Sequence, residues 1–282
     1  MTEDAYGATI AKRRLSRILS ELRIKSGYTA NQVTDKLNWG RGKVGRFEAN
    51  VWRRPEMSDI RDLLRIYAVS DGDQERLEEI AMLARIRAWW RDYPEVFENE
   101  FPGFENDAAR IRTYMPLVLP GLLQTKAYIE AQLMSGSKPP DWRARALDAR
   151  LRRQAILDRD GGLAPELIAV ITEASLRYHW GTVTDRRAQI GHLVEMSRRP
   201  GVELRLLRFA DGPHPGMSSL INIFDFPHDP SVVFLEDDVT IQEVDEPKRV
   251  QAMSDTFGQI RDAAMDPVGT TAYLKQLAET LE

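Results

Sequence analysis

The stretch Thr29–Arg54, TANQVTDKLNWGRGKVGRFEANVWRR, has the pattern of two short helices joined by a tight turn. Thr29 and Gln32 stand at capping-box spacing, in which each side chain can bond the backbone N–H of the other residue. Val33 and Leu37 then lie one turn apart, on the face that we expect to be buried. The first of the two helices is therefore predicted to begin at Thr29.

The second helix of this stretch is predicted to begin near Arg41, after a turn over 38–40 in which Gly40 is the cap. Val44 and Phe47 face inward at i and i+3. Five residues are left facing outward: Arg41, Gly42, Lys43, Gly45 and Arg46. Two short helices crossing at such a turn form a helix-turn-helix, whose second helix enters the DNA major groove.

The charge of the chain is divided unevenly. Residues 9–69 hold 14 Lys and Arg against 6 Asp and Glu, a balance of +8, within a chain whose net charge is −4. The remainder therefore carries −12. A basic N-terminal region on an acidic body is typical of a nucleic-acid-binding domain joined to a domain that does not bind DNA, although solvated charges can also cluster by chance.

The basic residues of the stretch fall into two predicted roles. Arg41 and Arg46 lie five residues apart on the groove-facing side, and the planar fork of arginine can donate to O6 and N7 of guanine together. Lys43, Arg53 and Arg54 suit phosphate contacts, which fix the register on the duplex. Gln32 could reach a phosphate too, although capping is the simpler role. A solvated basic face is the alternative for Arg41 and Arg46.

The N-terminal region resembles the Cro/repressor-type helix-turn-helix family, also called the xenobiotic-response-element family. The resemblance covers about the first 70 residues. The matching residues are Tyr28, Thr29, Val33, Leu37, Val44, Arg46, Phe47, Glu48, Arg53, Arg54 and Pro55. Ala30 and Gly40 depart from the family pattern, which often has glutamine and serine or threonine there. The resemblance implies a compact bundle of helices that binds DNA.

Residues 71–90 predict a further helix that ends in Trp89 and Trp90 and links the two domains. The aromatic pair is typical of a junction between domains, although it could also hold a ligand. We expect a helix-turn-helix domain over 1–70, a linking helix over 71–93 and a larger domain over 94–282. The fold class is thus a mainly α bundle followed by an α+β domain with a small sheet.

The larger domain is predicted to alternate helices with a few strands. Proline and glycine within 101–125 argue against a regular helix through that segment. Helices are predicted at about 125–135, 141–158, 188–198 and 246–264, and strands at 165–172, 202–207, 220–226 and 232–235. Arg153, Gln154 and Glu173 could face a pocket, and an ordinary salt bridge or a solvated face is the alternative.

The larger domain resembles the C-terminal domain of actinobacterial regulators of the WhiJ type. The residues that carry the resemblance are LVLPGLLQT at 117–125, Arg153, Gln154, the segment 173–176, the strand 232–236 and the pair Trp89 and Trp90. The resemblance spans roughly residues 90–270. It implies a domain for sensing or interaction, often encoded beside a small partner protein in an arrangement likened to toxin–antitoxin pairs.

Several classes of function find no support in the sequence. The chain has no cysteine, and its four histidines show no metal-binding spacing. No glycine-rich phosphate loop and no nucleophile motif is present, so we expect neither an enzyme nor a metal or cofactor. No apolar run is long enough to span a membrane and the N-terminus does not resemble a signal peptide, which favours a cytoplasmic protein.

Two functions and a third alternative follow. The first is a transcriptional regulator that binds double-stranded DNA as a homodimer and whose C-terminal domain responds to a small-molecule effector or a protein. The second is an antitoxin-like protein that controls a small protein encoded by a neighbouring gene and binds DNA to regulate itself. The third is an enzyme with a helix-turn-helix appendage.

Overall fold

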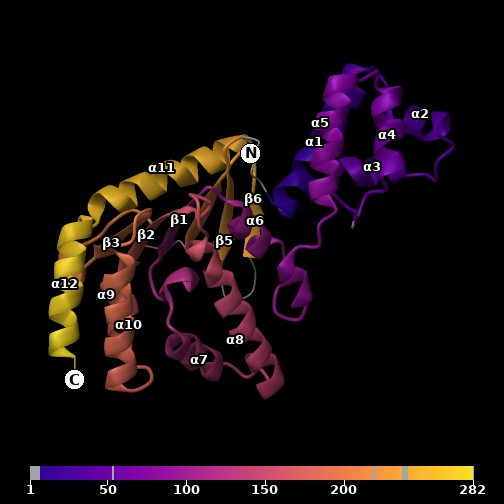
Figure 1. The fold of residues 1–282 in the computed structure, drawn as a ribbon. Coiled ribbons are helices and arrows are strands. Elements are labelled where there is room, and N and C mark those ends of the chain that lie inside the picture. Colours follow the sequence, from indigo (N-terminus) through magenta and orange to yellow (C-terminus); the bar gives the residue numbers. More distant parts are fainter. Residues whose placement is uncertain (1–6, 53, 218–219, 237–240, 282) are drawn as a thin grey trace. The chain divides into compact units, whose positions relative to one another are not determined.

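The computed structural model describes residues 7–52, 54–217, 220–236 and 241–281 of the 282-residue chain. The chain divides into two compact units, residues 1–91 and 92–282 (Figure 1). The first unit is helical, and the second combines helices with a six-stranded mixed sheet. The fold class predicted from the sequence is therefore confirmed.

The first unit is a bundle of five helices around one apolar core. The helices are α1 (Ala8–Lys25), α2 (Ala30–Lys36), α3 (Lys43–Glu48), α4 (Met57–Ile66) and α5 (Asp71–Ala84). The core contains Val33, Val44 and Phe47, as their spacing predicts. α5 packs against α1 and α4 inside this unit, and a short 3-10 helix, η1 (Trp89–Asp92), follows it.

The position of α3 is fixed by an ion pair with α1. Arg23 donates from Nε to Glu48 Oε1 at 2.6 Å and from Nη2 to Glu48 Oε2 at 2.9 Å. The two side chains are only 17% and 14% exposed. A bidentate arginine–carboxylate pair fixes orientation as well as distance. This pair therefore holds the end of α3 against the first helix.

The start of α3 differs from the one predicted. α3 begins at Lys43 rather than near Arg41, because Gly42 has φ +76° and a left-handed residue cannot continue a right-handed helix; Gly42, not Gly40, is the N-cap. α4 begins after Glu56. α5 begins at Asp71, as predicted, after Ser70, which caps it by accepting from Asp73 N–H, but it ends at Ala84 rather than at Trp90. Asn50 has a left-handed conformation, with φ +59°, where the chain leaves α3.

The sheet of the second unit has the strand order β3-β2-β1-β4-β5-β6. The strands are β1 (Arg110–Met115), β2 (Glu166–Thr172), β3 (Val202–Leu207), β4 (Ile221–Asp225), β5 (Val232–Glu236) and β6 (Ile241–Val244). β1 and β2 are parallel, as are β2 and β3, whereas β4, β5 and β6 continue the sheet antiparallel. Four of these strands, β2 to β5, were predicted from the sequence.

Two strands and three helices escaped the sequence analysis, among them α9 (Glu173–Arg177). β1 lies in the segment 101–125 that proline and glycine marked as irregular, and its arginines hide the alternation of a buried strand. α6 (Phe101–Asp107) forms in the same segment, because Pro102 occupies the first turn, where a missing N–H costs nothing. β6 and α12 (Pro267–Thr280) were also missed.

The remaining helices cover the sheet. They are α7 (Lys126–Ser135), α8 (Pro140–Gln154), α9 (Glu173–Arg177), α10 (Val183–Met196) and α11 (Pro247–Ala263), with 3-10 turns η2 (Gly121–Leu123), η3 (Ala155–Asp158) and η4 (Phe209–Asp211). α11 packs its Phe257 and Ile260 on one face of the sheet. On the other face, Phe101 and Phe104 of α6 contact Phe234 of β5 edge-on.

Replacement of Glu48 with glutamine should destabilise the first unit. Glu48→Gln keeps the shape but removes the charge that two hydrogen bonds from Arg23 reach, a loss of about 1–3 kcal/mol. Amide hydrogen exchange over α1 and α3 should then accelerate about 5- to 150-fold in the full chain. Glu21→Gln is the matched control, because Glu21 is 61% exposed and pairs with Arg17 at 3.4 Å. Equal exchange in the two variants would contradict the role given to this ion pair.

Candidate functional site

The helix-turn-helix of the first unit consists of α2, a turn and α3. Thr29 caps α2 by accepting from Gln32 N–H at 3.2 Å, and Gln32 Oε1 accepts from Thr29 N–H at 2.8 Å, so the predicted capping box is confirmed. Asn38, with φ +52°, reverses the chain after α2. Trp39 packs on the core and contacts the ring of Phe47, as its apolar character predicts.

Three of the predicted DNA-binding arginines are exposed. Arg41 lies in the turn before α3, Arg46 lies within α3, and Arg54 follows the helix. The side chains of these three arginines form no ion pair and no hydrogen bond with another described residue. A Cβ on Gly42 would lie 3.6 Å from Arg46 Nη1, so the guanidinium is close to the start of the helix. Arg53 lies outside the described residues.

Lys43, predicted to contact a phosphate, already binds two side chains of the first unit. Its Nζ donates to Asp59 Oδ1 at 2.6 Å and lies 4.1 Å from the centre of the Trp39 ring. The side chain is 30% exposed. Lys43 therefore ties the first turn of α3 to α4, and a phosphate would have to compete with Asp59 for it.

Trp52 anchors the chain where it leaves α3, and the sequence analysis did not single it out. Its Nε1 donates to Ser16 Oγ at 3.1 Å and to Phe47 O at 3.2 Å, and its ring contacts that of Phe47. Lys12 Nζ lies 5.2 Å from the centre of the Trp52 ring. An aromatic residue two positions after the left-handed Asn50 was the available signal.

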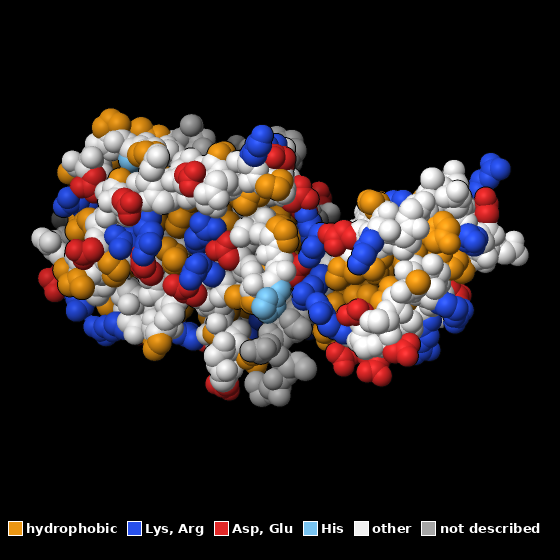
Figure 2. All heavy atoms as spheres, turned by 90° about the horizontal axis from the view of Figure 1, so that it is seen from above, with side chains coloured by type: hydrophobic (Ala, Val, Ile, Leu, Met, Phe, Trp, Pro, Cys, Tyr) orange, Lys and Arg blue, Asp and Glu red, His pale blue; other side chains and the backbone are white. Residues whose placement is uncertain are grey.

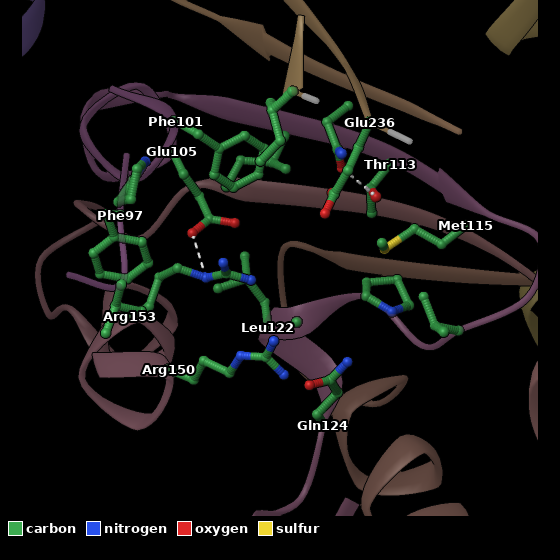
Figure 3. Close-up of a pocket in the computed structure, with 18 of the residues that line it drawn as sticks. Phe97, Phe101, Glu105, Thr113, Met115, Leu122, Gln124, Arg150, Arg153 and Glu236 are labelled. Carbon is green, nitrogen blue, oxygen red and sulfur yellow. Dashed lines mark hydrogen bonds and ion pairs between the residues drawn. The ribbon is translucent and has the colours of Figure 1, made fainter. Parts of the chain in front are cut away.

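The second unit contains a pocket of about 630 Å³ on the sheet face opposite α11 (Figure 3). Its floor is the inward side of β1, where Ile111, Thr113 and Met115 alternate with residues on the other face. α6 and α8 form its walls. Thr113 Oγ1 donates to Asn222 Oδ1 at 2.7 Å, which joins β1 to β4 within the pocket.

An ion pair stands inside this pocket. Arg153 Nε lies 2.9 Å from Glu105 Oε2, and Glu105 is only 4% exposed. Burial raises the pKa of Glu105, and the positive charge of Arg153 limits that rise. The guanidinium also lies over Phe101, 5.6 Å from the ring centre. Figure 3 shows the side chains of Glu105 and Arg153 pointing toward each other, joined by a dashed line that marks the ion pair.

Of the ligand-binding residues suggested by the sequence, only Arg153 lines the pocket. Gln154 supports its wall instead, because Nε2 donates to Gly121 O at 2.7 Å and to Gln124 O at 2.8 Å. Trp89 and Trp90 belong to η1, and Trp90 is buried beneath Arg91.

Glu173 lies away from the pocket and joins three elements. It accepts from Arg177 Nε at 2.6 Å, Tyr273 OH at 2.8 Å and Phe209 N–H at 3.0 Å. Burial raises the pKa of Glu173, but these three hydrogen bonds outweigh burial and hold the pKa below its usual value. The carboxylate therefore fixes α9 to η4 and α12, which is a structural role.

The sequence analysis missed most of the polar residues that line the pocket. Ala146 and Ala149 are fully buried on α8, and Arg150 and Arg153 continue that face at helical spacing. This spacing separates them from the exposed arginines of the same helix and could have identified them. Glu105 and Thr113 carried no comparable signal, since α6 and β1 were themselves missed.

Other classes of site find no geometric support. In residues 7–52, 54–217, 220–236 and 241–281, no group of three or more His, Asp or Glu side chains is arranged to hold a metal ion. No helix in the described part of the chain is long and apolar enough to cross a membrane. On the face of the second unit seen in Figure 2, basic and acidic side chains lie side by side, unlike the single-sign surface of a nucleic-acid site.

The helical bundle with α2, the turn and an exposed α3 defines a DNA-binding regulator of the helix-turn-helix class. Residues 14–77 match the family described as a helix-turn-helix domain, which supports a DNA-binding regulator. Residues 99–276 match the family described as a domain of unknown function (DUF5753), and since this match spans more than half of the chain, the protein belongs to that family. No curated protein and no solved structure matches the chain.

Replacement of Gly121 with alanine should disturb the ion pair of the pocket. A Cβ at this position would lie 1.8 Å from Arg153 Nη2 and 3.0 Å from Cζ, so the guanidinium must move away and leave Glu105 buried without its partner. We expect a loss of about 1–3 kcal/mol in the free energy of unfolding of the second unit, read from urea denaturation.

Gly136→Ala is the control for this substitution. Gly136 ends α7 with φ −94°, and a Cβ there meets nothing within 4 Å. Its effect should stay within about 0.5 kcal/mol. If Gly121→Ala were equally mild, Arg153 would be free to leave Glu105 at no cost.

Proposed function

We propose that this protein is a sequence-specific transcriptional regulator that binds double-stranded DNA as a homodimer and whose second unit senses a small molecule. The observation that carries the DNA part is the exposure of Arg41 and Arg46 around the start of α3, on a buried framework that matches a helix-turn-helix domain. The proposal also includes that the protein is related to regulators of the xenobiotic-response-element and WhiJ types.

Arg41 and Arg46 are proposed to contact base edges. Arg46 lies on α3, and Arg41 lies in the turn directly before it, so the chain presents two arginines from one end of the recognition helix. An unpaired guanidinium can donate two parallel hydrogen bonds to guanine, and each such contact contributes roughly 1–3 kcal/mol of discrimination. Two half-sites read by a homodimer would multiply this preference, with a separation of about 34 Å.

The other basic residues are proposed to contact phosphates. Arg54 is exposed after α3, and Arg53 and Lys43 share the role predicted from the sequence. Gln32 retains Nε2 for a phosphate, since only its Oε1 is used in the cap. Phosphate contacts set the register and make binding depend on salt, but they do not distinguish one sequence from another.

The sensing role is proposed for the pocket of the second unit. A volume of about 630 Å³ falls within the range of roughly 300–1,000 Å³ that is common for small-molecule sites. Aromatic walls with a few polar groups are also typical of such sites. A small molecule is therefore favoured over a protein partner as the effector. The antitoxin-like alternative would be supported by co-purification of a small protein from the native source.

The double substitution Arg41→Ala and Arg46→Ala should abolish the preference for specific DNA. A mobility-shift titration of the full chain on its own promoter should show at least 10-fold weaker binding, while affinity for unrelated DNA falls much less. Arg76→Ala on α5 is the control, because Arg76 is exposed on a helix outside the helix-turn-helix and should leave binding within about two-fold. Specific binding that survives the double substitution would refute the assigned recognition surface.

Arg54→Ala should separate the phosphate contacts from the base contacts. The plot of log affinity against log salt should become less steep by about one unit, since one fewer phosphate is neutralised. The order of preference among DNA sequences should stay unchanged. A changed preference would instead place Arg54 at a base edge.

A further inference from the structure

Arg150 lines the pocket with a charge that has no ion-pair partner among the described residues. Its Nη1 donates to Gln132 Oε1 at 3.1 Å. A guanidinium has five N–H donors, so most of its capacity is unused. Burial lowers the pKa of Arg150, the nearby charge of Arg153 lowers it further, and Glu236 opposes both. An anion at this position would relieve the cost of holding the charge away from water.

Arg153 cannot serve in the same way, because Glu105 already pairs with it. The distance between Arg153 Nε and Glu105 Oε2 is 2.9 Å, and both groups are largely buried. The two arginines lie three residues apart on α8, yet only one of them has a carboxylate within 4 Å among the described residues. The pocket therefore has one neutralised arginine and one arginine available to a ligand.

Gln124 supplies an acceptor beside Arg150. Its Nε2 donates to Leu119 O at 2.7 Å, which fixes the orientation of the amide, and its Oε1 has no hydrogen-bond partner among the described residues. The residue is only 5% exposed. Figure 3 shows the end of the Gln124 side chain next to the Arg150 guanidinium in the same part of the pocket. A ligand with a donor near its anionic group would satisfy both residues.

The opposing charge is Glu236 at the end of β5. Although the residue as a whole is exposed, its carboxylate lies among protein atoms, and this desolvation raises its pKa against the effect of Arg153 and Arg150. Figure 3 shows its side chain directed into the pocket beside Thr113. Glu236 would compete with an anionic ligand and would favour a cationic one. Glu98 also lines the pocket, and Arg153 is already paired with Glu105, so the preference for an anion rests on Arg150 and the unsatisfied amide of Gln124 in their own part of the pocket.

Much of the rest of the lining is apolar, although Glu98, Asn99 and Gln132 also belong to it. Phe97 and Phe101 lie on one side, and Met115, Val118 and Leu122 lie on the other. Each such side chain, when covered by a ligand, contributes through the apolar area that leaves water. The pocket therefore combines one charged end with an aromatic and aliphatic body.

We propose that this pocket binds a small amphipathic anion, with its carboxylate or phosphate group at Arg150 and its apolar body between Phe101 and Leu122. The proposal rests on the sensing role proposed above and names the class of effector. A planar guanidinium donates two parallel hydrogen bonds to either anionic group, so the two groups share one recognition chemistry. Gln124 Oε1 would accept a hydrogen bond from a hydroxyl or N–H close to that group.

The test uses four probes with the same body and different ends: 4-phenylbutyrate, 4-phenylbutyl phosphate, 4-phenylbutanol and 4-phenylbutylamine. Calorimetric titration into the full chain should show that at least one of the two anions binds at least 10-fold more tightly than the alcohol and the amine. The stronger of the two anions identifies the source as a carboxylate or a phosphate. Preference for the amine or the alcohol, or no binding of any probe at millimolar concentration, would overturn the proposal.

Arg150→Gln should weaken the better anion at least 10-fold and leave the alcohol unchanged. Arg150→Lys keeps the charge but loses the fork, so part of the affinity should return and show that the fold is intact. Arg152→Gln is the matched control on the same helix, since Arg152 is exposed and does not line the pocket. Equal affinities of the Arg150→Gln and Arg152→Gln variants for the anion would refute the assignment of Arg150.

A mobility-shift titration with and without the better anion separates this proposal from the proposed function. If the anion binds at Arg150 but leaves the affinity for DNA unchanged, the ligand class stands and the sensing role fails. If DNA binding responds to the anion equally in the wild-type and Arg150→Gln proteins, the pocket assignment fails and the regulator remains. The two failures therefore give different results.

Discussion

β1 pairs with β2 along one edge and with β4 along the other. Its register therefore fixes the face of the sheet on which each of its side chains lies. Alternation sends Arg112 to the α11 face, where it pairs with Asp225 at 2.8 Å and reaches Ser254. The same alternation sends Ile111 and Thr113 to the pocket floor. A slip of one residue would exchange the two sets and place a guanidinium in the pocket, so the composition of the pocket depends on this register.

The ion pair between Glu105 and Arg153 determines which arginine of the pocket is left unpaired. Glu105 is buried by α6 and needs a cation within a few ångströms, because an isolated buried carboxylate is very costly. Arg153 supplies it, and the space for its guanidinium exists only because Gly121 has no side chain. Arg150, one turn earlier on α8, then has no carboxylate within 4 Å in the part of the chain that the structure describes. The glycine of one loop thereby determines which arginine remains available to a ligand.

Local signals made the first unit predictable and left the second only partly so. The capping box of Thr29 and Gln32, and the i, i+3 spacing of Val44 and Phe47, involve neighbours in sequence and were recovered. The start of α3 shifted by two residues because the backbone at Gly42 is left-handed, which the sequence pattern does not reveal. β1 was not recovered, since its arginines are satisfied by Asp225 and Glu166, more than 50 residues away. A pattern that alternates charged and apolar residues becomes a buried strand only when such distant partners exist. The pocket residues on β1 and α6 were lost with those elements.

The recognition surface depends on backbone conformation more than on helix length. α3 contains only six residues, too few to be stable alone, and its end is fixed by Glu48 through Arg23. Its beginning is fixed by Gly42, which adopts a left-handed conformation that costs L-amino acids roughly 1–2 kcal/mol. Of the glycines near the helix, only Gly45 lies inside it and weakens it; Gly42 is the residue that allows it to begin. Arg41 precedes Gly42 in the chain and Arg46 follows it within α3. The backbone conformation of Gly42 therefore sets the direction of the Arg41 side chain relative to that of Arg46. An altered residue at this position would change the direction of Arg41 relative to Arg46 while leaving both charges in place.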